Sequence, residues 1–471
     1  MLALLLLVAC ASRPVAAPLP TSTEPSAPLR ERMARTLSEA IRIRTVNPPG
    51  REAALAEYYA RLLSAAGLET QVVPTPAADG RGRRAAAWAR WPGRGLRPPI
   101  VLLSHLDVVA ARPEEWQRDP FSGELHDGFV HGRGALDAKG VSVVHLFALS
   151  ELARRRLTLD RDVIFLATPD EENGGRLGAG YIAERRTELL RGARDLLTEG
   201  GSVLLGTANQ PSSWRVSVAE KSPCWVRVTA HGESGHSSVP RRGDAVDRLL
   251  RALARIRELH FPDRVTPETA AMFRALAPLA SEADRSAYAD LELALASDPE
   301  FRERFVAGDA QRALVQNTLA ITVLRGSPRT NVLASEAMAH LDLRLLPGGN
   351  CDDEIEGLRR AVSDAAVSLE ALLSFPSRTS PTDTALYRAV ARVAARQEPG
   401  AVLVPQVNSG FTDAHYFRSL GLVAYGFTPR WHYQGEHLGV HGTDERISVE
   451  NLERGVETLI ELLQELDALE R

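Results

Sequence analysis

Residues 99–107 read PIVLLSHLD, a short apolar run that ends in a histidine and an aspartate. A continuous apolar run of this length is typical of a strand buried on both faces, as in a parallel α/β sheet. Residues 162–172 read DVIFLATPDEE and repeat the arrangement, with acidic residues after the run. Open α/β sheets place their ligands at the carboxyl ends of strands. The two stretches therefore predict an α/β fold with its chemistry at one edge of the sheet.

The sequence around these strands predicts one large domain interrupted by a smaller one. From Trp225 onwards short alternating strands replace the continuous apolar runs, and the predicted order is β-α-β-β-α-β, which makes a split βαβ sandwich. Its elements are expected at 225–230, 244–259, 319–324, 338–345, 353–366 and 368–374. We therefore expect a catalytic domain of 30–222 and 376–471 with an inserted α+β domain at 223–375. The charged stretch 262–312 is expected to be an added helical excursion.

The composition excludes some partners. The chain has 471 residues, which at about 100 to 200 residues per domain predicts two or three domains. Its 56 basic and 60 acidic side chains leave a charge of −4, so nothing calls for nucleic acid or an anionic membrane. Only Lys139 and Lys221 are lysines. Because all other basic residues are Arg, a Lys suggests a position that the wider guanidinium does not suit.

The N-terminus predicts export. Residues 1–10, MLALLLLVAC, form an apolar run of signal-peptide length that is too short to span a membrane. Its end resembles a bacterial lipobox, in which Cys10 receives a lipid; a plain signal peptide is the alternative. Residues 11–29 are expected to be a flexible tether. The sequence thus predicts a periplasmic protein, secreted across the bacterial inner membrane and attached to a membrane by its lipid anchor only.

The other two cysteines carry no motif. Cys224 and Cys351 are too few and too scattered for a disulfide framework, and no Cys/His cluster indicates a structural zinc. We expect both to be buried thiols. Any metal site must then use His, Asp and Glu.

The polar motifs are weak when each is taken alone. An H-x-D such as His105 to Asp107 occurs by chance, and Asp137 could simply cap the helix that follows it. Glu171 and Glu172 could be solvated loop carboxylates. Their co-occurrence in one order, several at the ends of apolar strands, is what makes them informative.

In that order the motifs resemble the dizinc metallopeptidases of family twenty, which include aminoacylases, glutamate carboxypeptidase, acetylornithine deacetylase and succinyl-diaminopimelate desuccinylase. The resemblance runs from about Arg30 to the C-terminus. It is carried by HLD at 105–107, GRGALDAKG at 132–140, TPDEE at 168–172, GHSS at 235–238, TNV at 330–332 and HGTDE at 441–445. It implies a zinc-dependent exopeptidase-like catalytic domain with a mixed sheet, plus an inserted lid or dimerisation domain.

The resemblance also assigns roles to single residues. It implies two zinc ions per chain, for which Co²⁺ or Mn²⁺ could substitute, with the ligands His105 and Glu199 for one, Glu172 and His441 for the other, and Asp137 as the bridge. Asp107 would orient His105 without itself binding zinc, and Glu171 would be the general base. Imidazole and carboxylate suit Zn²⁺. Without metal, three clustered carboxylates would repel one another, which makes the cluster costly as a purely structural feature.

Further residues are expected to contact the substrate. The loop with Ser409, Gly410 and Thr412 resembles the family's loop near the substrate carboxylate, and Asn331 and Arg344 are expected contacts from the inserted domain. In related enzymes that form a homodimer through this domain, a histidine matching His236 reaches the partner's zinc site. There it could donate a hydrogen bond to the oxyanion of the tetrahedral intermediate.

The predicted reaction is metal-assisted hydrolysis of an amide bond whose amine side carries a free carboxylate. The substrate is either a peptide C-terminal residue or an N-acyl amino acid, since the chain looks most like the Gly-X carboxypeptidases and the secreted N-acyl-amino-acid hydrolases. No G-x-S-x-G elbow, phosphate loop or dinucleotide glycine pattern competes. The alternative is an inactive substrate-binding lipoprotein of the same fold.

Overall fold

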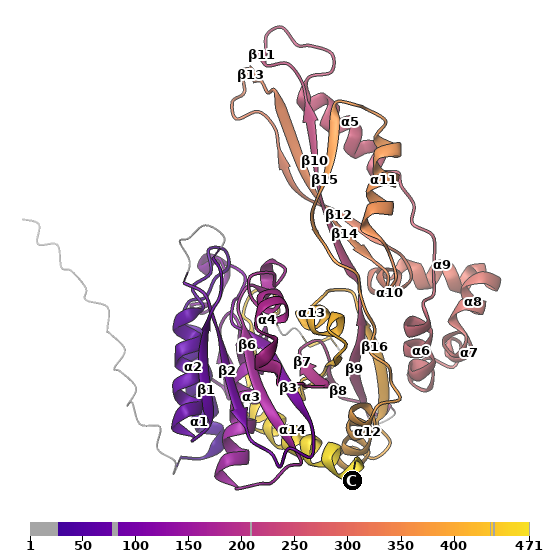
Figure 1. Cartoon of the computed structure of the whole chain (residues 1–471). Coiled ribbons are helices and arrows are strands. Elements are labelled where there is room, and N and C mark those ends of the chain that lie inside the picture. Colours follow the sequence, from indigo (N-terminus) through magenta and orange to yellow (C-terminus); the bar gives the residue numbers. More distant parts are fainter. Residues whose placement is uncertain (1–26, 78–82, 208–209, 434, 437–438, 471) are drawn as a thin grey trace, which may run out of the picture.

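The structure, a computed structural model, describes residues 27–77, 83–207, 210–433, 435–436 and 439–470. The predicted signal peptide, the lipobox with Cys10 and nearly all of the tether lie outside these residues. Figure 1 shows a lower body built on a large sheet and a smaller sheet domain that rises from it. None of the described helices has the length and apolar character needed to cross a membrane.

A mixed sheet forms the centre of the lower body. Its strand order is β1-β2-β6-β3-β7-β17-β9-β8-β18, with β16 paired to β9. The strands β3, β6, β7 and β17 run parallel, whereas β1 and β2 are antiparallel to their neighbours. The bounds are β1 Glu69–Pro74, β2 Ala85–Trp91, β3 Arg97–His105, β6 Arg161–Thr168, β7 Asp195–Thr198, β8 Ser202–Leu204, β9 Ser213–Glu220, β16 Val402–Asn408, β17 Val423–Gly426 and β18 Trp431–His432.

Helices cover both faces of this sheet, which explains the continuous apolar runs. On β3, Ile100 and Leu102 face one hydrophobic cluster while Val101 and Leu103 face another. The first cluster is covered by α1 Leu29–Arg42, α2 Ala53–Ala65, α3 Lys139–Arg154, α12 Ala385–Gln397 and α14 Val449–Leu469. The second is covered by α4 Ala179–Arg185, the 3-10 turn η3 Thr187–Leu190 and α13 Ala414–Ser419. The predicted α/β fold with a mixed sheet is confirmed.

The smaller domain, called the lid below, follows the predicted β-α-β-β-α-β order. Its antiparallel sheet has the order β12-β14-β10-β15, and two helices pack on it. A short hairpin of β11 and β13 lies at the tip farthest from the lower body (Figure 1). The bounds are β10 Ser222–His231, β11 Gly235–His236, α5 Ala245–Arg257, β12 Thr318–Arg325, β13 Val332–Leu333, β14 Glu336–Leu345, α11 Cys351–Val362 and β15 Val367–Ser374.

The chain passes between the body and the lid twice, and the two crossings lie side by side. The first runs from β9 into β10 through Lys221, and the second follows β15. Ser377 on the second crossing donates its backbone N–H to Ser222 Oγ at 2.7 Å, and its hydroxyl donates to the carbonyl of Glu220. The two connections are thus hydrogen-bonded to each other.

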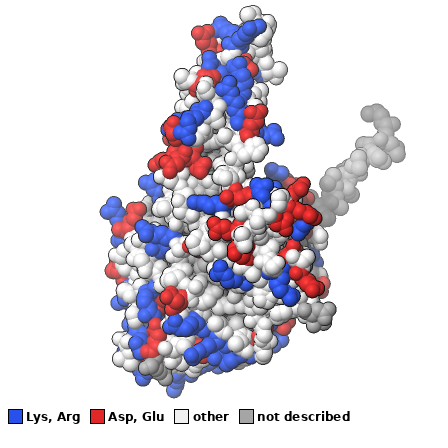
Figure 2. All heavy atoms as spheres, turned by 90° about the vertical axis from the view of Figure 1, so that its right-hand side faces the viewer, with Lys and Arg blue, Asp and Glu red and all other residues white. Residues whose placement is uncertain are grey.

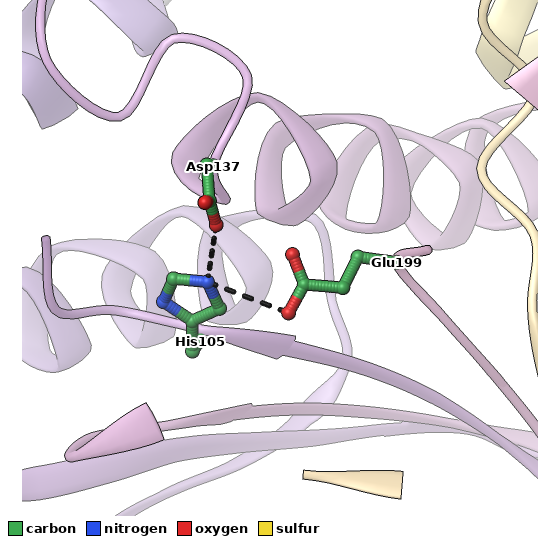
Figure 3. Close-up of side chains that lie close together, drawn as sticks. All are labelled: His105, Asp137 and Glu199. Atoms are coloured by element: carbon green, nitrogen blue, oxygen red, sulfur yellow. Dashed lines mark hydrogen bonds and ion pairs between the residues drawn. The ribbon is translucent and has the colours of Figure 1, made fainter. Parts of the chain in front are cut away.

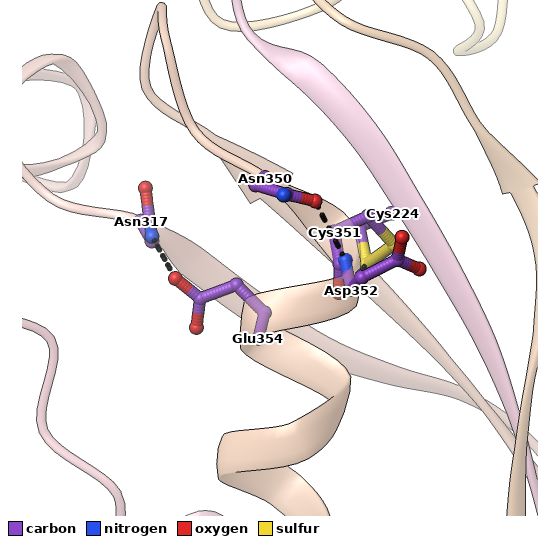
Figure 4. The surroundings of a disulfide bond; sticks show 6 residues. All are labelled: Cys224, Asn317, Asn350, Cys351, Asp352 and Glu354. Atoms are coloured by element: carbon purple, nitrogen blue, oxygen red, sulfur yellow. Dashed lines mark hydrogen bonds between the residues drawn. A yellow bond between two sulfur atoms is a disulfide. The ribbon is translucent and has the colours of Figure 1, made fainter.

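A disulfide joins Cys224 to Cys351, so the expectation of two buried thiols is wrong (Figure 4). The two residues are 127 positions apart in the chain, but β10 carries one and α11 begins with the other. Packing of α11 on the lid sheet brings their Cα atoms to 5.4 Å, within bonding range. Asn350 caps the same helix end, where its side chain accepts a hydrogen bond from the N–H of Asp352 at 2.9 Å.

The predicted excursion consists of short helices beside the junction of body and lid. Its first helix packs against β16 of the central sheet, and Phe273, Phe301 and Phe305 belong to a small apolar cluster of its own. It therefore lies beside the body and does not reach the hairpin at the tip of the lid (Figure 1). The helices are α6 Pro267–Leu276, α7 Arg285–Ala289, α8 Leu291–Ser297, α9 Pro299–Ala307 and α10 Asp309–Val315, with the 3-10 turn η4 Ala277–Leu279.

The two lysines occupy similar buried positions. Lys139 Nζ donates to the carbonyls of Ala40 and Ile43 at 2.9 and 2.8 Å, at the end of α1. Lys221 Nζ does the same at the end of α10, where the carbonyls of Ala313 and Gln316 lie at 2.9 and 2.8 Å. Burial lowers the pKa of each lysine to about 7. Each is a compact donor to the free carbonyls of a helix C-terminus.

Replacing Lys139 by Arg is expected to destabilise the protein and to lower its activity. The larger guanidinium has to enter a fully buried site, and overpacking of this kind costs about 1 to 3 kcal/mol. Lys139 also begins α3, two residues after Asp137, so a shift would reach that carboxylate. The free energy of unfolding in urea and kcat/KM test this, with the exposed Arg112→Lys change as control. Equal effects of the two substitutions would contradict the inference.

Candidate metal centre

Strand ends and two loops bring all five predicted metal ligands together. His105 is the last residue of β3, and Glu199 follows β7, the neighbouring parallel strand. Glu172 lies in a 3-10 turn, η2 Glu171–Asn173, after β6. Asp137 and His441 come from the loops before α3 and before β19 Arg446–Ser448. Figure 3 shows the His105 ring between Asp137 and Glu199.

The five side chains form two triads that share Asp137. His105 Nε2 lies 2.7 Å from Asp137 Oδ1 and 3.5 Å from Glu199 Oε1 (Figure 3). On the other side, His441 Nε2 lies 3.0 Å from Asp137 Oδ2 and 3.1 Å from Glu172 Oε2. Within each triad the potential ligand atoms lie within 4.8 Å of one another. The two oxygens of one carboxylate thus face two separate sets of ligands.

The donor set fits a pair of zinc ions. Each triad offers imidazole and carboxylate, which are zinc ligands, and a shared carboxylate is suited to two ions about 3.5 to 4 Å apart. His105 Nδ1 lies 3.0 Å from the backbone carbonyl of Asp107, so Nδ1 donates and the lone pair of Nε2 faces the site. Glu172 Oε1 is buried and has no hydrogen-bond partner among the described residues. A buried carboxylate oxygen without a partner is suited to binding a metal ion.

Several ionisable groups of the site have pKa values that differ from their usual ones. Burial raises the pKa of Glu199 to about 7 against the opposing effect of His105, and burial raises the pKa of Glu171 well above its usual range. Hydrogen bonds to Asp137 and Glu172 raise the pKa of His441 to about 10. Raised pKa values of buried carboxylates and of a neighbouring histidine are the expected response to a cluster of negative charges.

Asp107 acts on both sides of the site. Its backbone carbonyl holds His105, while its carboxylate accepts the N–H groups of Glu171 and Glu172, both at 3.1 Å. Asn47 donates to the same carboxylate at 2.8 Å, and Arg84 in turn donates to Asn47 Oδ1 at 2.6 Å. A fully buried carboxylate therefore fixes the turn that carries a ligand and the predicted base.

The turn that carries Glu171 and Glu172 directs their side chains apart. The two residues lie in the 3-10 turn η2. The two N–H donors to Asp107 favour the turn. Successive side chains of a 3-10 turn diverge by about 120°, since it has three residues per turn. Glu172 reaches the metal ligands, and Glu171 lies beside them, 8% exposed.

Glu445 is a buried organiser of the site that the sequence did not reveal. One of its oxygens accepts the N–H groups of Leu136 and Asp137 at 2.8 and 3.1 Å. The other accepts the N–H of Gly134 at 3.0 Å and the Arg133 guanidinium at 2.7 Å. Glu445 stands four residues after His441, so it joins the loops of two metal ligands. The sequence signals that could have indicated this role were the position of Glu445 in HGTDE and the position of Arg133 in GRG.

Replacing Glu445 by Gln is expected to weaken zinc binding about 10- to 100-fold, as losses of partners behind metal ligands do. An amide has one acceptor oxygen, so the loop of Asp137 loses half of its anchor and its ion pair with Arg133. The zinc dissociation constant, measured by competition with a chromogenic chelator, tests this. Glu457→Gln, on the surface of α14, is the control. Unchanged zinc affinity with reduced stability alone would contradict the role.

The residues predicted to contact the substrate lie farther apart than the metal ligands do. Ser409 and Gly410 are exposed in the loop after β16, whereas Thr412 is buried and donates to Glu220 Oε1 at 2.8 Å. Arg344 is paired with Asp342 at 2.8 Å and stacks over Phe411. His236 and Asn331 meet at the tip of the lid, where Ser237 N–H donates to the Asn331 carbonyl at 3.2 Å. Within one chain that tip lies far from the metal ligands (Figure 1).

Comparisons with known proteins agree with this geometry. The profile described as "Peptidase family M20/M25/M40" matches residues 101–465. The N-fatty-acyl-amino acid synthase/hydrolase PM20D1 of Xenopus tropicalis is 31% identical to the chain, over 78% of the chain and 72% of that protein. Aminoacylase-1 of Mus musculus is 27% identical, over 80% of the chain and 82% of that protein.

A solved structure shares the fold. The M20 family metallo-carboxypeptidase Sso-CP2 from Sulfolobus solfataricus superposes with a TM-score of 0.70 at 18% identity. The superposition covers 93% of this chain and 99% of the other. At this identity the likeness speaks for the fold alone.

Proposed function

Because the chain belongs to the peptidase family M20/M25/M40, and its relatives include an aminoacylase and an N-fatty-acyl-amino acid synthase/hydrolase, we propose that it hydrolyses amide bonds with two zinc ions. The reaction would release an amino acid from an N-acyl amino acid or from a peptide C-terminus. The single observation that carries the proposal is the pair of triads that share Asp137, with Glu171 beside them. An intact ligand set and base argue against an inactive binding protein.

The residues divide the work by position. The five ligands would hold the metals, which when bound polarise the scissile carbonyl and lower the pKa of water towards about 7. Glu171 takes the proton of the attacking water and passes it to the leaving amine, a role suited to a buried carboxyl whose pKa lies above its usual range. Asp107 and Glu445 hold the turn and the loop in place.

A hydrolysis screen tests the proposal. The zinc-loaded protein is offered N-acyl amino acids with short and long acyl chains, and dipeptides with a free or an amidated C-terminus. Release of the amino acid, lost on dialysis against a chelator and restored by zinc, is the expected result. Faster turnover of acyl substrates would place the chain with the hydrolases, and faster turnover of dipeptides with the carboxypeptidases. Failure to cleave any of them would contradict the proposal.

We also propose that the active unit is a homodimer formed through the lid, in which His236 serves the partner's metal centre. What supports this is the position of His236 on the exposed hairpin of β11 and β13, together with Asn331 and remote from the ligands of its own chain. His236 Nδ1 accepts the N–H of Ser238 at 3.1 Å, which leaves Nε2 free to donate.

The His236→Ala change is expected to lower kcat and to leave the zinc content unchanged. Mixing this variant with Glu171→Gln should restore activity, because in a hybrid dimer one site combines Glu171 of one chain with His236 of the other. With random exchange of equal amounts, half of the dimers are hybrids, and one of the two sites in each hybrid has both wild-type residues. About a quarter of wild-type activity is therefore expected. No recovery under conditions shown to exchange subunits would contradict action in trans.

For location we propose export to the bacterial periplasm with a lipid anchor. The apolar start of the sequence and the LVAC pattern support it, and a disulfide between Cys224 and Cys351 suits an oxidising compartment. On the face shown in Figure 2, acidic and basic side chains intermingle. Labelling of the full-length protein with a fatty acid, lost in Cys10→Ala, tests the anchor.

A further inference from the structure

The turn η2, which carries Glu171 and Glu172, is held at both of its ends. At its start the N–H groups of these two glutamates donate to the Asp107 carboxylate. At its other end the Tyr416 hydroxyl, from α13, donates to the carbonyl of Gly174 at 2.8 Å. Gly174 ends the turn, and its own N–H donates to the carbonyl of Glu171 at 2.8 Å. Sequence analysis gave Tyr416 no role.

The packing of α13 on this segment leaves no space for further side chains. A Cβ on Gly175 would overlap Asp413 Oδ1 and stand 3.0 Å from the Tyr416 ring. A Cβ on Gly180, in α4, would stand 2.8 Å from the same ring. Thr168 Oγ1, at the end of β6, donates to the other carboxylate oxygen of Asp413 at 2.8 Å. The start of α13 therefore packs along the whole segment from β6 to α4.

The same helix stacks on the second crossing between body and lid. The rings of His415 and Phe375 are parallel within 3°, with their centroids 3.4 Å apart, and Phe375 is the first residue after β15. His415 is buried, and burial lowers its pKa to about 3, so the stacked ring is uncharged. Leu373, still on β15, lies 3.0 Å from the Cβ position of Gly174. The end of the lid sheet thus contacts both the turn and the helix that holds it.

The loop before α13 also contacts the lid. The ring of Phe411 lies edge-on to Phe375, with centroids 5.2 Å apart, and 6.1 Å from the ring of Trp225 on β10. The Arg344 guanidinium of β14 lies 4.9 Å from the centroid of the Phe411 ring. Figure 1 shows α13 below the base of the lid. Aromatic contacts therefore connect the lid sheet with the helix that fixes η2.

We propose that Tyr416 positions the turn η2 for catalysis, and that the stack of Phe375 on His415 makes this position depend on the orientation of the lid; the inference rests on the proposed hydrolysis. Tyr416 acts through the carbonyl of Gly174, two residues after Glu172. A general base must lie within hydrogen-bond reach of the proton it abstracts, so a small shift of η2 lowers turnover. When the lid rotates, Phe375 moves with β15, and α13 carries the movement to the turn.

The Tyr416→Phe change tests the positioning role, because it removes one hydroxyl and keeps the ring beside Gly175 and Gly180. We expect kcat for the best substrate of the screen to fall about 3- to 10-fold, the equivalent of one hydrogen bond, with KM and zinc content unchanged. Tyr58→Phe is the matched control, since it removes a hydroxyl that donates to Glu39 at 2.6 Å on the other face of the sheet. A wild-type kcat in Tyr416→Phe, or a loss of zinc, would overturn the role.

A double-mutant cycle tests the link to the lid. Phe375→Leu keeps an apolar side chain but loses the ring face, so it should lower kcat by a similar factor, whereas Phe375→Tyr should keep most of the turnover. Because both residues act on the same turn, the variant that combines Phe375→Leu with Tyr416→Phe should be no slower than the slower single variant. Effects that multiply would show that the two residues act independently, and the link would fail.

Hydrogen exchange separates this inference from the proposed function, because it needs no substrate. In the zinc-loaded protein, Phe375→Leu and Tyr416→Phe should both speed the exchange of the amides of residues 171–175, and Tyr58→Phe should not. Unchanged exchange in both variants would overturn the inference in an active enzyme. A wild-type protein that hydrolyses no compound of the screen would instead contradict the proposed function and with it the positioning role, while the exchange rates would still decide the link to the lid.

Discussion

The Glu171→Gln variant is expected to keep both zinc ions and to lose about 10²- to 10⁴-fold in kcat, the usual contribution of a general base. Gln preserves the shape of the side chain and the backbone N–H that donates to Asp107, so the turn stays in place. Only the proton acceptor is removed. Kinetics of the best substrate from the screen, together with zinc analysis of the same sample, measure both quantities.

The control for this variant is Glu188→Gln, which changes an exposed glutamate that is paired with Arg186. It should leave kcat and zinc content at wild-type values. A Glu171→Gln protein that has lost zinc would show that Glu171 is a ligand, and the assignment of the two neighbouring glutamates would have to be reversed.

Glu172→Gln is expected to fail in the opposite way, by losing the zinc held with His441. Glu172 Oε2 lies 3.1 Å from His441 Nε2, inside the triad, and an amide is a poor zinc ligand. Since a metal contributes several kcal/mol to the transition state, we expect a loss of about 10²- to 10⁴-fold in activity. Zinc content should fall towards one ion per chain.

Excess zinc distinguishes the two variants. It should restore part of the activity of Glu172→Gln by mass action and none of the activity of Glu171→Gln. The same response to zinc in both variants would contradict the division of roles.

The five proposed metal ligands could be predicted because their motifs occur in the order of a known family. The apolar strands explain only why His105 and Glu172 meet at one edge of the sheet, and each motif alone was weak. Glu445 could not be predicted in the same way. A glutamate beside a ligand motif has the sequence of a solvated loop residue, and its role depends on N–H groups that lie some 300 positions away in the chain.

The disulfide and the lysines show a second kind of limit. Cys224 and Cys351 are paired only through the packing of α11 on β10, which no spacing along the chain encodes. The scarcity of lysine did indicate two unusual positions, but not that both are buried at helix ends. That follows from where α1 and α10 stop, and helix ends are the least certain part of any prediction from sequence.

The two hydrogen-bonded connections between body and lid form the hinge region of the lid. Because Ser377 joins the second crossing to Glu220 and Ser222 on the first, we expect the two connections to bend together if the lid rotates against the body. In such a rotation Arg344, opposite Pro223 at the start of β10, would move little, whereas the hairpin of β11 and β13 with His236 would move farthest. In the proposed dimer a small rotation would then be enough to bring His236 to the partner's metal centre or away from it.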